Sequence, residues 1–144
     1  MEVKVINKSK NQLPQYETIA AAGLDIRADI EEAITLKPLE RALVPTGLYV
    51  EIPIGYEIQV RPRSGLAAKF GLTVLNSPGT IDADYRGEIK VILANISNEE
   101  YTLQPEERVA QLVLAKHEQI QWTPTDTLSS TVRGEGGFGS TGKQ

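Results

Sequence analysis

Short windows in which apolar and polar residues alternate run through most of the chain. In "GYEIQV", for example, Tyr56, Ile58 and Val60 alternate with Glu57 and Gln59, which is the two-residue period of a half-buried β-strand. Similar segments follow between glycine, proline and asparagine residues, at Val3 to Ile6, Leu24 to Ala28, Leu48 to Ile52, Leu72 to Leu75, Glu88 to Ile96, Arg108 to Leu114 and Ile120 to Trp122. Short strands at this spacing, without a long helical period, predict an all-β fold: a jelly-roll-like β-sandwich or barrel.

One short helix is predicted within this pattern, over "RSGLAAKFG". Ser64 is expected to cap the helix with its hydroxyl, and Leu66, Ala67 and Ala68 favour helical conformation. Gly71 is expected to end the helix after about two turns, because glycine readily adopts the left-handed conformation found at helix C-termini.

The chain changes character at Thr123, after which apolar residues become rare. We therefore predict a single domain, with a β jelly-roll body over residues 1–122 and a flexible C-terminal arm over residues 123–144. The arm ends in "RGEGGFGSTGKQ", where glycines around Phe138 allow the backbone to approach a ligand closely. A merely solvated tail is the alternative, although such a tail has no use for an aromatic ring.

Composition narrows the functional classes. The 144 residues, 40% of them hydrophobic, suffice for one domain with a substantial core. The absence of cysteine and the single histidine exclude disulfides and the usual zinc-ligand sets, so any bound metal must take oxygen ligands. A net charge of -4 without a basic run argues against nucleic-acid binding. No apolar stretch has the length of a signal peptide or a membrane span, so a soluble, cytoplasmic protein without a membrane partner is expected.

Two short stretches suggest sites for anions or cations. Arg63, Ser64 and Gly65 open the predicted helix, where a guanidinium, a hydroxyl and backbone amides can meet an anion. The alternative for them is an ordinary helix cap and a surface ion pair. Asp25 of "AAGLDIRA" lies in a strand that otherwise favours apolar residues, so its carboxylate needs a partner. That partner is either an arginine or a water of a hydrated magnesium ion.

A third stretch, "NSPGTIDADYRGE" from Asn76 to Glu88, has the turn residues of a long β-hairpin. The backbone of such a hairpin can pair with a planar base, as it would pair with another strand. Tyr85 offers a flat surface and Asp82 a general base. The alternative for Asp82 and Asp84 is ordinary solvation of a turn.

In this order, "AGLDIRA", "RPRSGLA", "NSPGTIDADYRGE", "ERVAQL" and "RGEGGFGSTG" resemble the five motifs of the homotrimeric deoxyuridine triphosphate nucleotidohydrolases, the dUTPases. The resemblance extends from Ala22 to Gly142. It implies a jelly-roll subunit, three subunits around an axis, and active sites at their interfaces. It also implies hydrolysis of dUTP to dUMP and pyrophosphate by Mg2+-assisted attack of water on the α-phosphorus. That reaction keeps uracil out of DNA and supplies dUMP for thymidylate synthesis.

The resemblance also implies roles for individual residues. Asp82 falls on the aspartate that activates the attacking water, and Tyr85 on the tyrosine that packs against deoxyribose and excludes a ribose 2′-hydroxyl. Asp25 falls on the aspartate that holds magnesium through water. The uracil contacts fall on Asn76, Gly79, Ile81 and Phe138. The phosphate contacts fall on Arg63, Ser64, Gly65, Gln111, Arg133, Gly139, Ser140 and Thr141. Arg86, His117 and Lys143 are left without an assigned role.

Two other functions fit parts of the same pattern. A dCTP deaminase would share the fold but convert cytosine, and a silent trimeric module would bind nucleotides without catalysis. The intact "GTIDADYRGE" and the Phe138-bearing arm favour the hydrolase over the deaminase. A silent relative would most simply lose the base, and this chain keeps Asp82.

Overall fold

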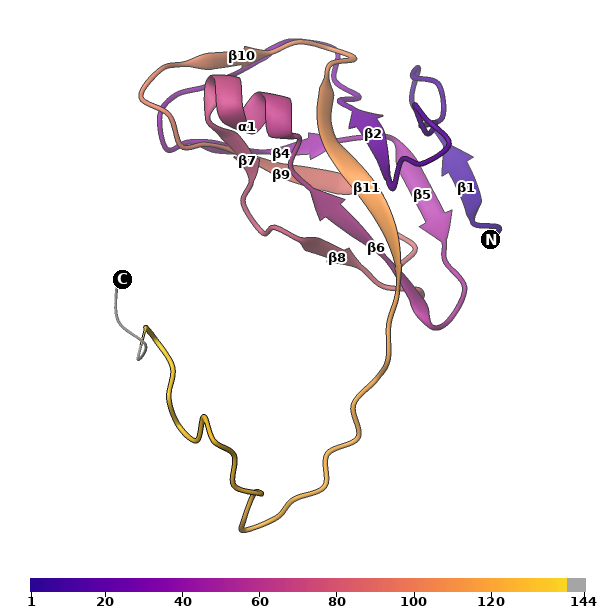
Figure 1. The fold of residues 1–144 in the computed structure, drawn as a ribbon. Coiled ribbons are helices and arrows are strands. Elements are labelled where there is room, and N and C mark those ends of the chain that lie inside the picture. The colour runs from indigo at the N-terminus through magenta and orange to yellow at the C-terminus, as the bar shows by residue number, and fades with distance from the viewer. Residues whose placement is uncertain (140–144) are drawn as a thin grey trace.

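The structure, a computed structural model, describes residues 1–139 of the chain (Figure 1). Strands dominate it, as the alternating pattern predicted. The strands are β1 (Lys4–Asn7), β2 (Gly23–Arg27), β3 (Ile34–Leu36), β4 (Arg41–Pro45), β5 (Leu48–Glu51), β6 (Tyr56–Arg61), β7 (Leu72–Val74), β8 (Gly79–Ile81), β9 (Lys90–Asn95), β10 (Tyr101–Leu103) and β11 (Arg108–Lys116), and the helix α1 (Ser64–Phe70) lies between β6 and β7.

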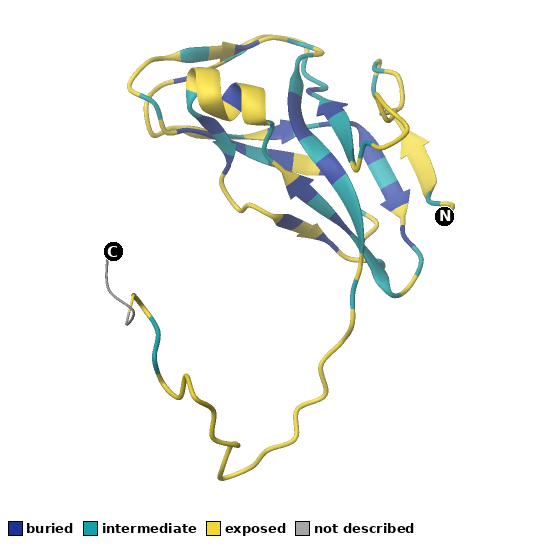
Figure 2. Ribbon diagram, viewed as in Figure 1, coloured by how far each residue is buried: buried dark blue, intermediate teal, exposed yellow. Residues whose placement is uncertain are grey.

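Two antiparallel sheets carry most of the core. One has the strand order β2-β11-β6-β8 and the other the order β4-β9-β7, while β1 pairs with β5 and β3 with β10 in separate ribbons. Buried residues appear as dark blue bands along the ribbons of both sheets in Figure 2. The most deeply buried include Ile26 and Val109 of the first sheet and Val44, Leu72, Val74, Val91 and Leu93 of the second. This arrangement confirms the all-β, jelly-roll-like fold.

Strand β6 shows why the two-residue period was informative. Ile58 and Val60 are buried, whereas Glu57 and Gln59 between them are only partly covered. Successive side chains of a strand point to opposite faces of the sheet, so one face of β6 joins the core and the other faces outward. β6 lies between β11 and β8, and it leads into α1. Because β6 pairs with β11, the residues just before α1 lie next to Gln111.

Some strand predictions were incomplete or wrong. Ile120 to Trp122 is not a strand; beyond β11 the described chain has no regular structure, and both apolar side chains are exposed. The sequence did not predict β3, β4 or β10. β3 and β10 have only three residues each, and β4 ends in a proline, so none of them shows a full alternation. The division of the chain at residue 122 stays a prediction.

Two similar turns follow the ribbon strands β3 and β10. In each, a proline is followed by a residue with positive φ, Leu39 (φ 66) or Glu106 (φ 65), as in a type II turn. The glutamate after it returns its carboxylate to the backbone at the start of the turn, with Oε2 of Glu40 and Glu107 accepting from Lys37 N at 2.8 Å and Gln104 N at 2.9 Å. The second turn leads directly into β11 and sets where that strand begins.

The helix forms where it was predicted, but Ser64 does not cap it. Arg63 is the N-cap residue, with extended backbone angles and no side-chain cap, and Ala67 N donates to Arg63 O at 3.0 Å. Ser64 is the first helical residue, so its hydroxyl comes one position too late to accept from the first amides. Gly71 ends the helix with φ 64, as expected. The helix packs against β7 through Leu66, and the Phe70 and Tyr101 rings lie 5.1 Å apart.

The hairpin predicted from Asn76 to Glu88 does not form within that stretch, because its one strand, β8, pairs with β6. β7 and β9 pair antiparallel, and the segment that joins them crosses to the other sheet, where its β8 pairs with β6. Within residues 1–139 no strand pairs with the outer edge of β8. The segment from Asn76 to Glu88 therefore brings free backbone groups to a sheet edge.

Among the described residues, no helix is long and apolar enough to cross a membrane.

Candidate active site

A cavity of about 490 Å³ opens beside β8, between it and the sheet that contains β4 and β9. Five residues that the sequence assigned to base, sugar and catalysis line it: Asn76, Gly79, Ile81, Asp82 and Tyr85. Their positions follow from the crossing segment, because β8 holds Gly79 and Ile81 while the turns at its two ends hold the others. The structure thus brings this part of the expected site together.

Gly79 keeps the cavity open at the sheet edge. A Cβ atom there would lie 3.2 Å from Val60 Cβ and 3.3 Å from Asn76 Nδ2, so a side chain would displace the groups that line the cavity. The free edge of β8 offers N–H and C=O groups in a fixed plane. A flat base with adjacent donor and acceptor groups can pair with such an edge.

Tyr85 stands in a fixed place at the cavity. Its hydroxyl donates to Glu88 O at 3.0 Å, and its backbone N–H donates to Asp82 O at 3.1 Å. The Arg86 guanidinium donates back to Ala83 O at 2.7 Å, which closes the turn that holds the ring. Arg86, to which the sequence gave no role, therefore supports the turn.

The Asp82 carboxylate is exposed, and no hydrogen bond or ion pair within residues 1–139 engages it. A carboxylate in this state can accept a proton from a water molecule placed in the cavity. Asp84, two residues later, does not line this cavity; it borders another of about 710 Å³ with Arg86 and His117, which Asp82 borders as well.

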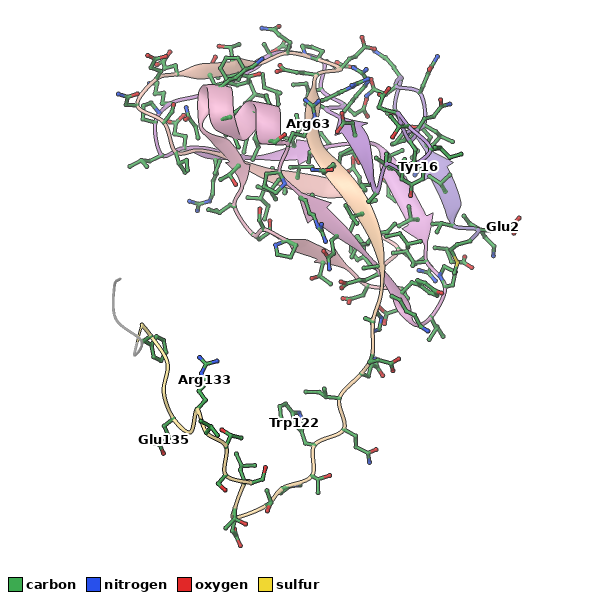
Figure 3. All side chains as sticks on the ribbon, in the orientation of Figure 1. Glu2, Tyr16, Arg63, Trp122, Arg133 and Glu135 are labelled. Atoms are coloured by element: carbon green, nitrogen blue, oxygen red, sulfur yellow. The ribbon has the colours of Figure 1, made fainter. Side chains whose placement is uncertain are left out.

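A second group of predicted residues lies where β2, β11 and the start of α1 meet, and Figure 3 labels Arg63 there. Arg63 binds the Asp25 carboxylate with two nitrogens, Nε to Oδ1 at 3.0 Å and Nη2 to Oδ2 at 3.0 Å. The two side chains are 29% and 22% exposed, so water and ligands can still reach them. Of the two partners considered for Asp25, the arginine is therefore present in the structure.

Arg108 completes this group, and sequence reasoning missed it. Its Nη1 lies 3.4 Å from Asp25 Oδ2, and its Nη2 lies 2.8 Å from Glu17 Oε1. Two guanidinium groups thus contact one carboxylate in the middle of β2. The only signal in the sequence was the position of Arg108 within "ERVAQL", because an isolated arginine at a strand end is usually just solvated.

Gln111 and Ser64 line a third, open cavity of about 550 Å³, together with Ser77 and Pro78 just before β8. The Gln111 amide donates to Pro62 O at 2.9 Å, which ties β11 to the segment that leads into α1. No hydrogen bond within residues 1–139 uses the Ser64 hydroxyl. Gly65 is exposed, with open space around it.

The arm lies apart from both groups. Arg133 sits on the extended segment in Figure 3, where its Nε donates to Gly136 O at 2.7 Å, and the exposed fraction of Phe138 is 114%. Over residues 118–139, each described hydrogen bond joins two residues of the arm. Gly139 is likewise exposed. Ser140, Thr141 and Lys143 lie outside the described residues.

The residues that the sequence grouped into one site thus occupy three separate places in a single chain. Asp82 and Tyr85 border one cavity, Arg63 binds Asp25 in the middle of β2, and Phe138 is on the arm. In the part of the chain that the structure describes, no cluster of three or more histidine, aspartate or glutamate residues could hold a metal.

Comparisons with known proteins point to one family. The family model for dUTPase matches residues 9–142. The chain is 63% identical over 143 residues to the deoxyuridine 5'-triphosphate nucleotidohydrolase of Fusobacterium nucleatum, covering 99% of this chain and 98% of that protein. It is 57% identical to the enzyme of the same name from Finegoldia magna, covering 99% of each. Among solved structures, the Staphylococcus bacteriophage 80alpha dUTPase with dUPNHPP matches with a TM-score of 0.87, at 27% identity and over 99% of each chain.

Proposed function

The chain belongs to the dUTPase family, and from that membership we propose how this dUTP diphosphatase works: water attacks the α-phosphorus of dUTP, magnesium assists, and dUMP and pyrophosphate leave. The observation that carries this mechanism is the cavity that gathers a free carboxylate, a fixed tyrosine and a free strand edge beside β8.

Asp82 is the general base in this proposal. It takes a proton from the attacking water as the bond from that water's oxygen to the α-phosphorus forms and the bond to the bridging oxygen of pyrophosphate breaks. An exposed carboxylate without a protein partner within residues 1–139 suits this task, because it is free to turn toward the water. The 80alpha enzyme was solved with dUPNHPP.

Uracil and deoxyribose occupy the cavity beside β8. The backbone at Gly79 and Ile81 pairs with the edge of the base, the Asn76 side chain contacts it, and Phe138 of an arm covers it. The ring of Tyr85 lies under the sugar and leaves no room for a 2′-hydroxyl. Glycine at position 79 supports this proposal, since a side chain there would narrow the cavity.

The phosphates lie between the helix start and an arm. Arg63, Ser64, Gly65 and Gln111 contact them from one side. Arg133, Gly139, Ser140 and Thr141 cover them from the other. A free hydroxyl at Ser64 and an amide at Gln111 that line the same cavity suit the recognition of phosphate oxygens.

Magnesium fits the donor set of this chain. It prefers oxygen ligands, keeps several waters, and commonly binds through nucleotide phosphates with few protein ligands. Asp25, whose carboxylate remains partly exposed beside two arginines, would hold it through water. When bound, the ion supplies positive charge to the phosphate oxygens and to the departing pyrophosphate.

We further propose that the chain forms a homotrimer with active sites at its interfaces, because its three groups of site residues do not meet within one subunit. Multi-angle light scattering is expected to give three times the mass of the chain, for a species that carries all of the activity. A stable and active monomer would contradict this expectation.

The substrate test is direct. Purified protein with magnesium is incubated with dUTP, UTP, dTTP and dCTP, and pyrophosphate and base conversion are measured. We expect pyrophosphate from dUTP at a rate at least about a hundredfold above that from UTP, because adding a hydroxyl against a rigid wall costs a few kcal/mol. Equal rates on dUTP and UTP would show that the sugar contact is misassigned. Deoxyuridine nucleotides formed from dCTP would point to a deaminase.

A further inference from the structure

The turn between β4 and β5 forms hydrogen bonds with residues that follow Tyr85. Thr46, at the centre of this contact, is buried, and its Oγ1 donates to Ile89 O at 2.6 Å. Ile89 N in turn donates to Leu48 O at 2.8 Å. The C=O of Ile89 is held by Thr46 of the turn and its N–H by Leu48, the first residue of β5, so the end of the loop from Asp82 to Glu88 has a fixed place.

The Glu88 side chain adds a third attachment. Its Oε1 accepts from the backbone N–H of Gly47 at 2.9 Å, and its Oε2 lies 3.6 Å from Lys90 Nζ. Only 19% of the side chain is exposed, so little water competes for the bond to Gly47. A carboxylate that accepts from a backbone amide in a mostly covered place forms one of the stronger hydrogen bonds in proteins.

The backbone of Glu88 also holds the tyrosine. Its carbonyl accepts the Tyr85 hydroxyl at 3.0 Å, so the tip of the ring follows wherever residue 88 is placed. The ring passes close to the intervening glycine: a Cβ atom at Gly87 would lie 2.3 Å from Tyr85 Oη. Glycine at 87 thus admits the ring, and the carbonyl at 88 fixes it.

To reject UTP, the side chain that packs against the sugar must keep its position. The ribose differs from deoxyribose by one hydroxyl, and a pocket that can yield discriminates weakly against such an addition. Tyr85 is 46% exposed, so packing alone leaves its ring room to turn aside. The bond to Glu88 O removes that freedom.

We propose that Glu88 is a positioning residue for sugar selection: its bond to Gly47 ties the Tyr85 loop to the β4–β5 turn and thereby holds the Tyr85 ring against the sugar. The inference rests on the proposed contact between Tyr85 and deoxyribose. Glu88 also borders the cavity beside β8, and the role proposed for it acts through Tyr85. A purely structural glutamate would affect stability and both substrates alike.

The test measures kcat and KM for dUTP and for UTP in the full-length protein and in four variants: Glu88→Ala, Glu88→Gln, Tyr85→Phe, and the double variant Glu88→Ala with Tyr85→Phe. We expect Glu88→Ala to lower the ratio of kcat/KM for dUTP to that for UTP by about tenfold, as for the loss of one hydrogen bond to a charged group. Most of the change should be in KM. Glu88→Gln keeps an oxygen for the Gly47 amide, and its ratio should stay within about twofold of wild type.

The double variant tests whether the two residues act as one unit. Tyr85→Phe removes the hydroxyl that Glu88 O accepts and should lower the ratio as well, and the double variant should be no less selective than the worse single one. Additive losses, an unchanged ratio in Tyr85→Phe, or equal losses in Glu88→Gln and Glu88→Ala would overturn the proposal. A wild type that fails to distinguish dUTP from UTP would instead refute the sugar contact itself.

Discussion

Replacing Asp82 with asparagine is expected to lower kcat on dUTP by about two orders of magnitude or more, which is the loss that follows removal of a positioned general base. Asparagine has nearly the same shape but cannot take a proton from the attacking water. The carboxylate is exposed and has no partner within residues 1–139, so the fold does not depend on it. Steady-state pyrophosphate release, with dUTP affinity measured separately by calorimetry, separates the loss of turnover from any loss of binding.

Asp84→Asn is the matched control, because it makes the same chemical change two residues away, at a residue that does not line the cavity beside β8. Its kcat should stay within about threefold of wild type, as for a surface substitution outside the site. Full activity in Asp82→Asn, or an equal loss in both variants, would contradict the assignment of the base.

Ending the chain after Val132 is the second large change. It removes Arg133, Phe138 and the glycine-rich end, and we expect kcat/KM for dUTP to fall by about a hundredfold or more. The estimate combines the stacking of one base on an aromatic ring with one charge-assisted contact to phosphate, each worth about 1–3 kcal/mol. Turnover and KM from the same pyrophosphate assay measure the effect.

The melting temperature gives the control for this truncation. The described part of the arm has no hydrogen bonds to residues 1–116, and Phe138 is exposed, so its removal should lower the midpoint by only a few degrees or less. Phe138→Leu in the full-length chain keeps an apolar side chain but removes the ring, and it should show an intermediate loss. A truncated protein with normal kcat/KM would reduce the arm to a plain tail.

Local sequence patterns predicted many of the strands and the helix, and the elements that they failed to predict have physical reasons. The alternation along β6, β9 and β11 and the glycine at the end of α1 are properties of short windows, and these elements formed as predicted. The three-residue strands β3 and β10 pair only with each other, and a single window of sequence cannot show that pairing. Ile120 to Trp122 has the composition of a strand but lacks a partner strand within residues 1–139.

The site residues were likewise predictable in part. The motifs predicted a group of site residues around β8, and five of them line the cavity there. Contacts between distant parts of the chain could not be predicted: Arg108 with Asp25 and Glu17, and Glu88 with Gly47, join residues far apart in sequence. The position of Ser64 depended on where the helix begins, and a shift of one residue changed its hydroxyl from a cap to a free group.

Each active site of the proposed trimer takes Asp82 from one subunit and its arm from another. Mixing two inactive variants tests this arrangement most directly. One variant has Asp82→Asn with an intact arm, and the other keeps Asp82 but ends after Val132. Equal amounts are unfolded, refolded together and checked for mixed trimers by native mass spectrometry. In cyclic order every mixed trimer has one site with both parts intact, so random assembly should restore about one quarter of the wild-type sites. Activity that stays at the level of the separate variants, although mixed trimers are present, would contradict the shared site.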